Sequence, residues 1–238
     1  MASTGGRKSI RLLLGMKPSN GYRRVVFAVG IVFGSGCGLS EYQSKYEKQQ
    51  ERMNYLDQEN LYLGQPLVLP AKKESNGPRV SVRLPLGISI KPDEELVGIL
   101  YRCPKSSAKS LQGANAKVSE IDSAFVAVET PGNWKEFKKR VLEPFKGVDP
   151  ESTRTVSLEI PGRPARTFET IAFTEGADPT WAYRFYFFRD ETCRVALGFR
   201  GSESALASET ARQAMEFSVK TLAVDNAPVP AAKKSSGG

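Results

Sequence analysis

Four β-type segments follow one another between residues 153 and 200 with only short turns between them. They read "TRTVSLEI", "ARTFETIAFTE", "TWAYRFYFFRD" and "CRVALGFR", and "PGRP", "GADP" and "RDET" interrupt them. A crossover between parallel strands needs a dozen or more residues, and some of these turns have no room for a helix. The segments therefore predict an antiparallel meander.

The remaining patterns of the same region predict further strands and two helices. "VSVRLPLGISI" (80–90) alternates like a half-buried strand, and "LVGILYRC" (96–103) and "SAFVAVET" (123–130) are apolar and β-branched. Asn133 is placed to cap a helix over "WKEFKKRVLEPF", and Ser208 to cap one inside "ASETARQAMEFSVKTLAV". Because "WAYRFYFF" is apolar on both sides near its end, the helices should cover the sheet. The predicted fold class is α+β, an antiparallel β-sheet flanked by two helices, over residues 79–224.

This order of elements resembles the PsbP-like sandwich family, which has early strands, one helix, a run of antiparallel strands and a terminal helix. The closing "MEFSVKTLAV" is similar to the final helix of that family and its exit. The resemblance covers about residues 79–224. It implies a non-enzymatic binding or assembly module and carries over no functional residue.

The N-terminal segment has the parts of an export signal. Arg23 and Arg24 stand directly before an apolar run from Val25 to Phe33, and small residues follow. The run is about half of the roughly 20 residues that a membrane-spanning helix requires. Residues 1–36 are therefore predicted to be a signal peptide, and a start at Met16 would give the basic region a more usual length.

The stretch "FGSGCG" resembles the lipobox of bacterial lipoproteins, in which small residues precede an invariant cysteine. Gly36 and Ser35 match that pattern, whereas Gly34 stands where an aliphatic residue is usual. The resemblance implies that Cys37 carries a diacylglyceryl group on its sulfur, that the peptide is cut before it, and that the new amino terminus is acylated. Two or more acyl chains give stable membrane anchoring. The alternatives are an uncleaved N-terminal anchor and an organelle transit peptide.

The charge of the chain is concentrated in this leader. The formal net charge is +8, and residues 1–36 contribute six basic groups and no acidic one, so the remainder carries only +2. A nearly neutral body lacks the positive field that phosphate binding needs. The sequence therefore argues against a nucleic-acid partner.

Three segments outside the folded domain have their own character. Residues 40–63 contain no glycine or proline and follow a 3-4-3-4 spacing, which predicts a helical stalk within 37–63 and weak self-association through 40–63. Residues 64–78 read as a linker with one apolar patch at 67–69, and residues 225–238 as a disordered tail.

The composition excludes several kinds of active site. The chain contains no histidine, so His-based triads and His-containing zinc sites are excluded. Cys103 and Cys193 have no CxxC companion, which argues against a metal site. In an exported protein these two either form a disulfide or remain as separate buried thiols.

Other chemistry-bearing side chains suggest structural roles. The paired carboxylates fit solvated turns better than an acid/base couple; they are Glu94 and Glu95, Glu120 and Asp122, and Asp190 and Glu191. Several aromatic residues fit core packing better than a ligand groove; they are Trp134, Trp181, Tyr183, Tyr186 and Phe188. We expect no catalytic residue, metal or cofactor.

These observations predict a membrane-anchored envelope lipoprotein that faces the periplasm from the cell membrane or the outer membrane. Its α+β domain is expected to be a non-catalytic module that binds or assembles with an envelope protein. The alternatives are an enzyme with a carboxylate- or serine-based site on the sheet, and a self-associating stalk protein. A transit peptide would instead place the chain in an organelle lumen.

Overall fold

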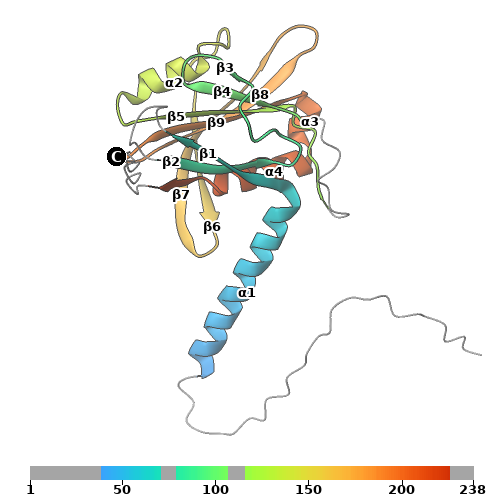
Figure 1. The fold of residues 1–238 in the computed structure, drawn as a ribbon, viewed down its shortest axis with the longest axis vertical. Coiled ribbons are helices and arrows are strands. Elements are labelled where there is room, and N and C mark those ends of the chain that lie inside the picture. The colour runs from blue at the N-terminus through green and yellow to red at the C-terminus, as the bar shows by residue number, and fades with distance from the viewer. Residues whose placement is uncertain (1–38, 71–78, 107–115, 226–238) are drawn as a thin grey trace, which may run out of the picture. The chain divides into compact units, whose positions relative to one another are not determined.

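The computed structural model describes residues 39–70, 79–106 and 116–225 (Figure 1). The described residues from Tyr42 onward belong to one compact unit. Four helices and ten strands follow in the order α1 Leu39–Tyr62, β1 Leu63–Pro70, β2 Arg79–Pro85, β3 Glu94–Glu95, β4 Leu100–Pro104, β5 Ser123–Glu129, α2 Trp134–Leu142, β6 Arg154–Ile160, β7 Arg163–Glu175, β8 Trp181–Arg189, β9 Arg194–Gly201, α3 Glu203–Ala207, α4 Glu209–Lys220 and β10 Ala223–Asp225.

The larger sheet is antiparallel and has seven strands in the order β3-β4-β5-β9-β8-β7-β6. Strands β6 to β9 lie side by side in chain order, which confirms the predicted meander. Strand β9 pairs with both β8 and β5, so the earlier strands extend the sheet from the end of the meander. The α+β class with antiparallel pairing is therefore as the sequence predicts.

Helix α2 covers one face of this sheet. Asn133 caps it as predicted, because its side chain accepts hydrogen bonds from the N–H groups of Lys135 and Glu136. The buried side of α2 packs on alternate residues of β5, β7, β8 and β9 in a core rich in aromatic rings. This core includes Phe125, Phe137, Val141, Ile171, Phe185, Phe187 and Ala196.

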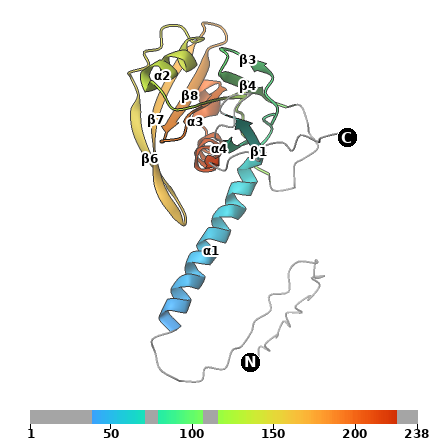
Figure 2. The same ribbon diagram turned by 60° about the vertical axis from the view of Figure 1, so that its left-hand side comes forward.

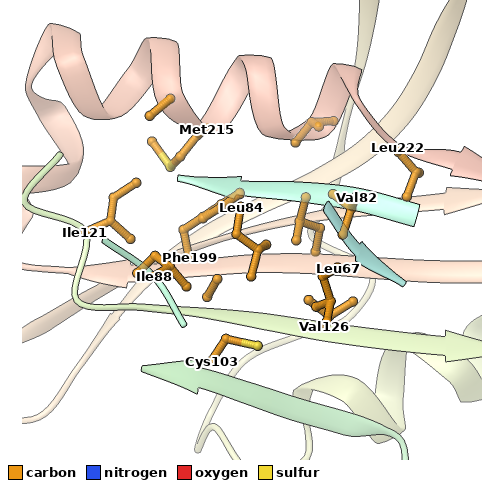
Figure 3. Packing of buried hydrophobic residues seen from close by; sticks show 14 of the residues in the cluster. Leu67, Val82, Leu84, Ile88, Cys103, Ile121, Val126, Phe199, Met215 and Leu222 are labelled. Carbon is orange, nitrogen blue, oxygen red and sulfur yellow. The ribbon is translucent and has the colours of Figure 1, made fainter. Parts of the chain in front are cut away.

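Helix α4 and a second sheet cover the opposite face (Figure 2). The second sheet has three antiparallel strands in the order β1-β2-β10. Ser208 caps α4 as predicted, and its apolar stripe is buried. Met215 and Leu222 belong to one core cluster with Val82 and Leu84 of β2 and Val126 and Phe199 of the larger sheet (Figure 3). Both faces of the central strands of the larger sheet are thus covered, in agreement with the doubly apolar character of β8.

The structure corrects the predicted boundaries near β1 and β2. Residue 63 of the predicted stalk and residues 64–70 of the predicted linker 64–78 form strand β1, in which Leu67 and Leu69 are buried against the core. The rest of the predicted linker, residues 71–78, lies outside the described residues. The strand predicted over 80–90 ends at Pro85 and belongs to the smaller sheet. The separate sheet forms because β1 and β10 pair with the two edges of β2. The sequences of β1 and β10 do not alternate clearly between apolar and polar residues, so neither strand is predicted. The first residue of the predicted tail 225–238, Asp225, belongs to strand β10 and pairs with Arg79 of β2. Residues 226–238 lie outside the described residues, as do the signal segment and Cys37.

Helix α1 confirms the predicted helical segment and contacts the domain only near its end. Residues 40–54 are exposed, whereas Tyr55 is half-buried and Glu59 and Tyr62 are buried. Arg83 of β2 fixes this end of the helix, since its guanidinium donates to Glu59 Oε1 at 2.6 Å and to Asn60 Oδ1 at 2.9 Å. The rings of Tyr55 and Tyr62 each lie 5.4 Å from that of Phe217 on α4. No helix within the described ranges is long and apolar enough to cross a membrane.

Candidate binding surface

Two grooves run along the exposed side of α4. The β6–α4 groove has a volume of about 600 Å³ and lies between α4 and the strands β6, β7 and β8. The α1–α4 groove has a volume of about 560 Å³ and lies between α4 and the last turns of α1. Arg212 and Glu216 of α4 line both grooves. The helix therefore forms the ridge between two open depressions.

The β6–α4 groove combines apolar and basic side chains. Val156 and Leu158 of β6 are half-buried, as is Tyr186 of β8, and all three line it. Arg154, Arg184 and Arg212 line it as well, against a single acidic residue, Glu216. Glu216 is itself paired with Lys220 at 2.6 Å, so the groove presents a positive field to an incoming group.

Tyr186 and Arg184 interact within this groove. Burial raises the pKa of Tyr186, and the nearby Arg184 guanidinium, which is hydrogen-bonded to the phenol, lowers it by less. The pKa therefore lies above its usual value. Tyr186 is thus a neutral hydrogen-bonding group at physiological pH.

A smaller cavity of about 220 Å³ lies where the end of α1 meets β2, β10 and the β6–β7 turn. Its lining includes Arg52, Tyr55, Arg83 and Arg163. The Tyr55 hydroxyl is buried and has no hydrogen-bond partner among the described residues. Burial raises the pKa of Tyr55 to about 12, with a further contribution from Glu59.

The carboxylates singled out in the sequence have structural partners. Glu94 pairs with Arg102 at 3.6 Å across strands β3 and β4. Asp122 accepts hydrogen bonds from Arg200 and Ser123. Burial alone would raise the pKa of Asp122, but these hydrogen bonds outweigh it and hold the pKa below its usual value. The pairing makes Asp122 a charged structural group rather than a proton carrier.

Asp190 has a comparable role in the turn before β9. Its Oδ1 accepts from Thr192 N at 2.8 Å and from Cys193 N at 2.8 Å. Burial raises the pKa of Asp190, but the hydrogen bonds from Thr192 and Cys193 lower it by more, so the net shift is downward. Glu191 beside it is exposed. Asp190 therefore closes a turn, as the sequence predicts.

Glu169 is a carboxylate with three side-chain partners that was not singled out by the sequence. It lies on β7 and accepts from Trp134 Nε1 at 2.7 Å, Lys138 Nζ at 2.8 Å and Thr153 Oγ1 at 3.1 Å. Burial raises its pKa, but these donors outweigh burial and hold the pKa below its ordinary value. Lys138 is buried. The ion pair between Lys138 and Glu169 therefore joins α2 to strand β7 through an ammonium group that is shielded from water.

Cys103 and Cys193 are free, buried thiols. Cys103 pairs in register with Ala124, which pairs with Phe199 of β9. Cys193 precedes Arg194 at the other end of β9, so six residues at roughly 3.3 Å each separate the level of Cys193 from that of Cys103. That exceeds the roughly 7 Å between Cα atoms that a disulfide allows, and the alternative of two separate thiols holds. Burial raises the pKa of each thiol to about 12, with smaller contributions from Asp93 and Asp190 respectively.

The aromatic residues considered for a ligand groove pack mainly in the core. Trp134 stacks on Phe137 with 5.7 Å between ring centroids, and the ring of Tyr183 lies 4.9 Å from that of Phe145. Trp181 lies beneath the Arg200 guanidinium at 4.6 Å. Tyr186 is the member of this set that lines the β6–α4 groove. Within residues 39–70, 79–106 and 116–225, no group of three or more His, Cys, Asp or Glu side chains is placed to hold a metal ion.

No protein-family model matches the chain, and no curated protein matches it. Among solved structures, a protein from Bacteroides thetaiotaomicron has 11% identity and a TM-score of 0.39 over 67% of this chain, which spans about half (48%) of that protein. The Ran-binding protein Mog1p of Saccharomyces cerevisiae has 12% identity and a TM-score of 0.36, covering 60% of this chain and 89% of Mog1p. A mutant of protein Mog1 has 11% identity and a TM-score of 0.39, covering 68% and 97% of the two chains. Likeness at these scores supports no statement about the function of this chain.

Proposed function

We propose that this chain is an envelope lipoprotein, anchored to a membrane through Cys37, whose α+β domain is a non-catalytic module that binds another envelope protein. The observation that carries the binding role is the pair of grooves along α4. They are open and mix apolar with charged side chains, as protein-binding surfaces do. The carboxylates that an enzyme would use, such as Asp122 and Glu169, are instead occupied by structural hydrogen bonds.

The tether rests on the residues around Cys37 and on the helix that follows. Cys37 comes directly after the small residues that close an apolar run, and lipid attachment uses its nucleophilic sulfur. Helix α1 has 24 residues, which at 1.5 Å per residue corresponds to about 36 Å. It would serve as a spacer between a lipid-modified Cys37 and strand β1.

Replacement of Cys37 by serine should abolish membrane association. We expect the native chain, expressed in a bacterium that processes lipoproteins, to enter the detergent phase in a phase-partitioning assay. The Cys37→Ser chain should stay in the aqueous phase, because no acyl chains are attached. The measurement is the ratio of the chain in the two phases by immunoblot.

Ser35→Ala is the matched control for this experiment. It changes the leader two residues from Cys37 and keeps both the thiol and a small residue there, so it should partition like the native chain. Equal partitioning of the native and Cys37→Ser chains would reject the lipid anchor. Retention of both in the membrane pellet would indicate an uncleaved anchor instead.

Self-association through α1 is a second candidate function, which one feature of the helix favours. Tyr42, Tyr46, Met53 and Leu56 are exposed, and Tyr46 and Met53 keep 61% and 53% of their surface open. Their spacing of four, seven and three residues places them on one side of the helix. Tyr55, Glu59 and Tyr62, which contact the domain, lie on the other side. The exposed stripe is therefore available to a second helix.

Charges beside the stripe favour a parallel pair of copies. In heptad terms Tyr46 and Met53 take a positions, which places Arg52 at g and Asp57 at the following e. In a parallel pair, Arg52 of each copy then faces Asp57 of its partner. Within the described part of one chain, neither residue has an ion-pair partner.

Cysteine crosslinking in membranes tests this pairing. Gln49→Cys, at the d position of the stripe, should give a disulfide-linked dimer under mild oxidation, because d positions of a parallel pair face each other. Glu47→Cys, on the outer side of the helix, should not. Adding Met53→Lys to the Gln49→Cys chain should remove the dimer. Equal crosslinking at positions 47 and 49 would contradict the pairing.

A further inference from the structure

Strand β6 forms one edge of the seven-stranded sheet. Within residues 39–70, 79–106 and 116–225 it is the last strand in the sheet order, and it pairs with β7 alone. Its seven residues, Arg154–Ile160, include neither proline nor glycine. The other edge strands described are blocked or short: β1 contains Pro66 and Pro70, β3 has two residues and β10 has three. Prolines and short length are common protections of a sheet edge, and β6 has neither.

The side chains of β6 alternate between an exposed face and the β6–α4 groove. Thr155, Ser157 and Glu159 are exposed, and Thr155 also contributes to the lining of the groove. Val156 pairs in register with the buried Phe168 and lines the groove together with Leu158. A strand that pairs with the free edge of β6 would therefore direct every second side chain toward the groove side of the sheet.

Arginines supply the charge on that side. Arg154 of β6 and Arg184 of β8 have no ion-pair partner within the described ranges, and both line the β6–α4 groove. Arg212 pairs with Glu209 at 3.3 Å, but both side chains are about 60% exposed. Such an exposed pair is weak, so Arg212 is free to turn to another carboxylate.

From these observations, and resting on the binding role proposed above, we propose that β6 and the β6–α4 groove bind an extended acidic segment of a partner protein. The segment adds to the free edge of β6 as an eighth strand. Its main chain pairs with β6, and its carboxylates face Arg154, Arg184 and Arg212. Main-chain pairing supplies affinity in this mode, and the alternate side chains supply selectivity.

A synthetic peptide tests this proposal directly. The probe is a fluorescein-labelled decapeptide of alternating valine and glutamate, in which all carboxylates lie on one face of the strand. It is titrated with the full-length chain in detergent, and fluorescence anisotropy reports binding. We expect saturable binding that weakens as salt rises, and no binding of the same peptide with lysine in place of glutamate.

Two charge-reversal variants locate the site. Arg154→Glu should weaken binding by at least about tenfold, since it places a carboxylate opposite those of the peptide. Arg79→Glu is the matched control, because Arg79 is also an exposed arginine at the start of a strand but belongs to the smaller sheet. It should bind like the native chain. Equal affinity of the native and Arg154→Glu chains would overturn the proposal.

N-methylated peptides test the added strand. Two versions, methylated on every valine nitrogen or on every glutamate nitrogen, each block one edge of the peptide. We expect one version to lose binding and the other to keep it, since one peptide edge pairs with β6. Undiminished binding of both versions would show a purely electrostatic contact and overturn strand addition.

Vesicles distinguish an acidic peptide from an anionic membrane surface. The Cys37→Ser chain is mixed with phosphatidylglycerol vesicles, with and without the added Arg154→Glu substitution. If the vesicles bind this chain, Arg154→Glu weakens that binding, and the peptide does not bind, the proposal is overturned in favour of a lipid site. If Cys37 carries lipid but the peptide does not bind, the binding site assigned to β6 is wrong and the proposed anchor stands. If the native chain is aqueous and unmodified but still binds the peptide, the proposed anchor is wrong and the β6 site stands.

Discussion

Gly198→Ala is expected to destabilise the domain by about 3 kcal/mol, near the upper end of what overpacking a core costs. Gly198 lies on β9 between two aromatic residues, since it pairs in register with Phe125 of β5 and with Phe185 of β8. A Cβ atom at this position would come within 2.7 Å of Phe185 Cζ and closer still to two other carbons of the ring. Phe185 is fully buried, so its ring has no open space into which to move.

Chemical denaturation of the full-length chain, followed by tryptophan fluorescence, measures this loss. Gly64→Ala is the control, because Gly64 is also in a strand and its Cβ would meet its nearest neighbour at an ordinary 3.7 Å. It should change stability by less than about 1 kcal/mol. Phe185→Leu should restore part of the loss in the Gly198→Ala background, as expected for neighbours that compete for one space. Equal effects of the two alanine substitutions would contradict the packing.

Glu169→Leu is expected to cost about 3 kcal/mol, because it leaves the buried ammonium group of Lys138 without its counter-charge. Lys138 keeps only 4% of its side chain exposed and lies 2.8 Å from Glu169. The double variant Lys138→Met/Glu169→Leu should be more stable than Glu169→Leu, since apolar residues of similar volume often replace a buried pair at little cost. Thermal unfolding of the two variants and the native chain provides the comparison.

The pH dependence supplies an independent check on the Glu169 pair. The pKa of Glu169 is lower in the folded chain than its ordinary value of 4.5. Its ionised form therefore stabilises the fold above about pH 4.5, and this contribution is lost as the pH falls through the folded pKa. The native chain should lose more stability over that interval than the double variant. Two results together would contradict this role of the pair: a double variant that is no more stable than Glu169→Leu, and a double variant that loses as much stability as the native chain when the pH falls.

Much of the fold could be predicted from the sequence because the relevant signals are local. The meander follows from the short turns between β6 and β9, and the two capped helices from Asn133 and Ser208. The smaller sheet could not be predicted, because its strands are far apart in the chain: β10 and β1 both pair with β2. "GQPLVLP" also contains two prolines, which read as a linker because an edge strand tolerates proline only in its final context.

The candidate surface was less accessible to sequence reasoning. Arg154, Arg184 and Arg212 are 30 and 28 residues apart along the chain, and nothing in the local pattern shows that β6, β8 and α4 bring them to one groove. Tyr186 was recognised as a possible groove residue, but only the register of β8 places it there. Glu169 was missed for the same reason, since its partners Trp134 and Lys138 come from α2.

In the proposed function, a lipid anchor at Cys37, the helix α1 as a spacer and the grooves along α4 would together form a tethered binding module. Such an anchor would confine the chain to a membrane surface and so raise the effective concentration of any partner held on the same surface. Weak contacts at the stripe of α1 or at β6 would then be sufficient for association. Without the anchor, the same contacts would have to act between freely diffusing molecules.

The intact mass of the native chain recovered from membranes tests this account most directly. The account predicts a chain that begins at Cys37 and carries the added mass of a diacylglyceryl group, with a further acyl chain where the amino terminus is modified. A mature chain that begins far from Cys37, or an unprocessed chain without added lipid mass, would contradict it.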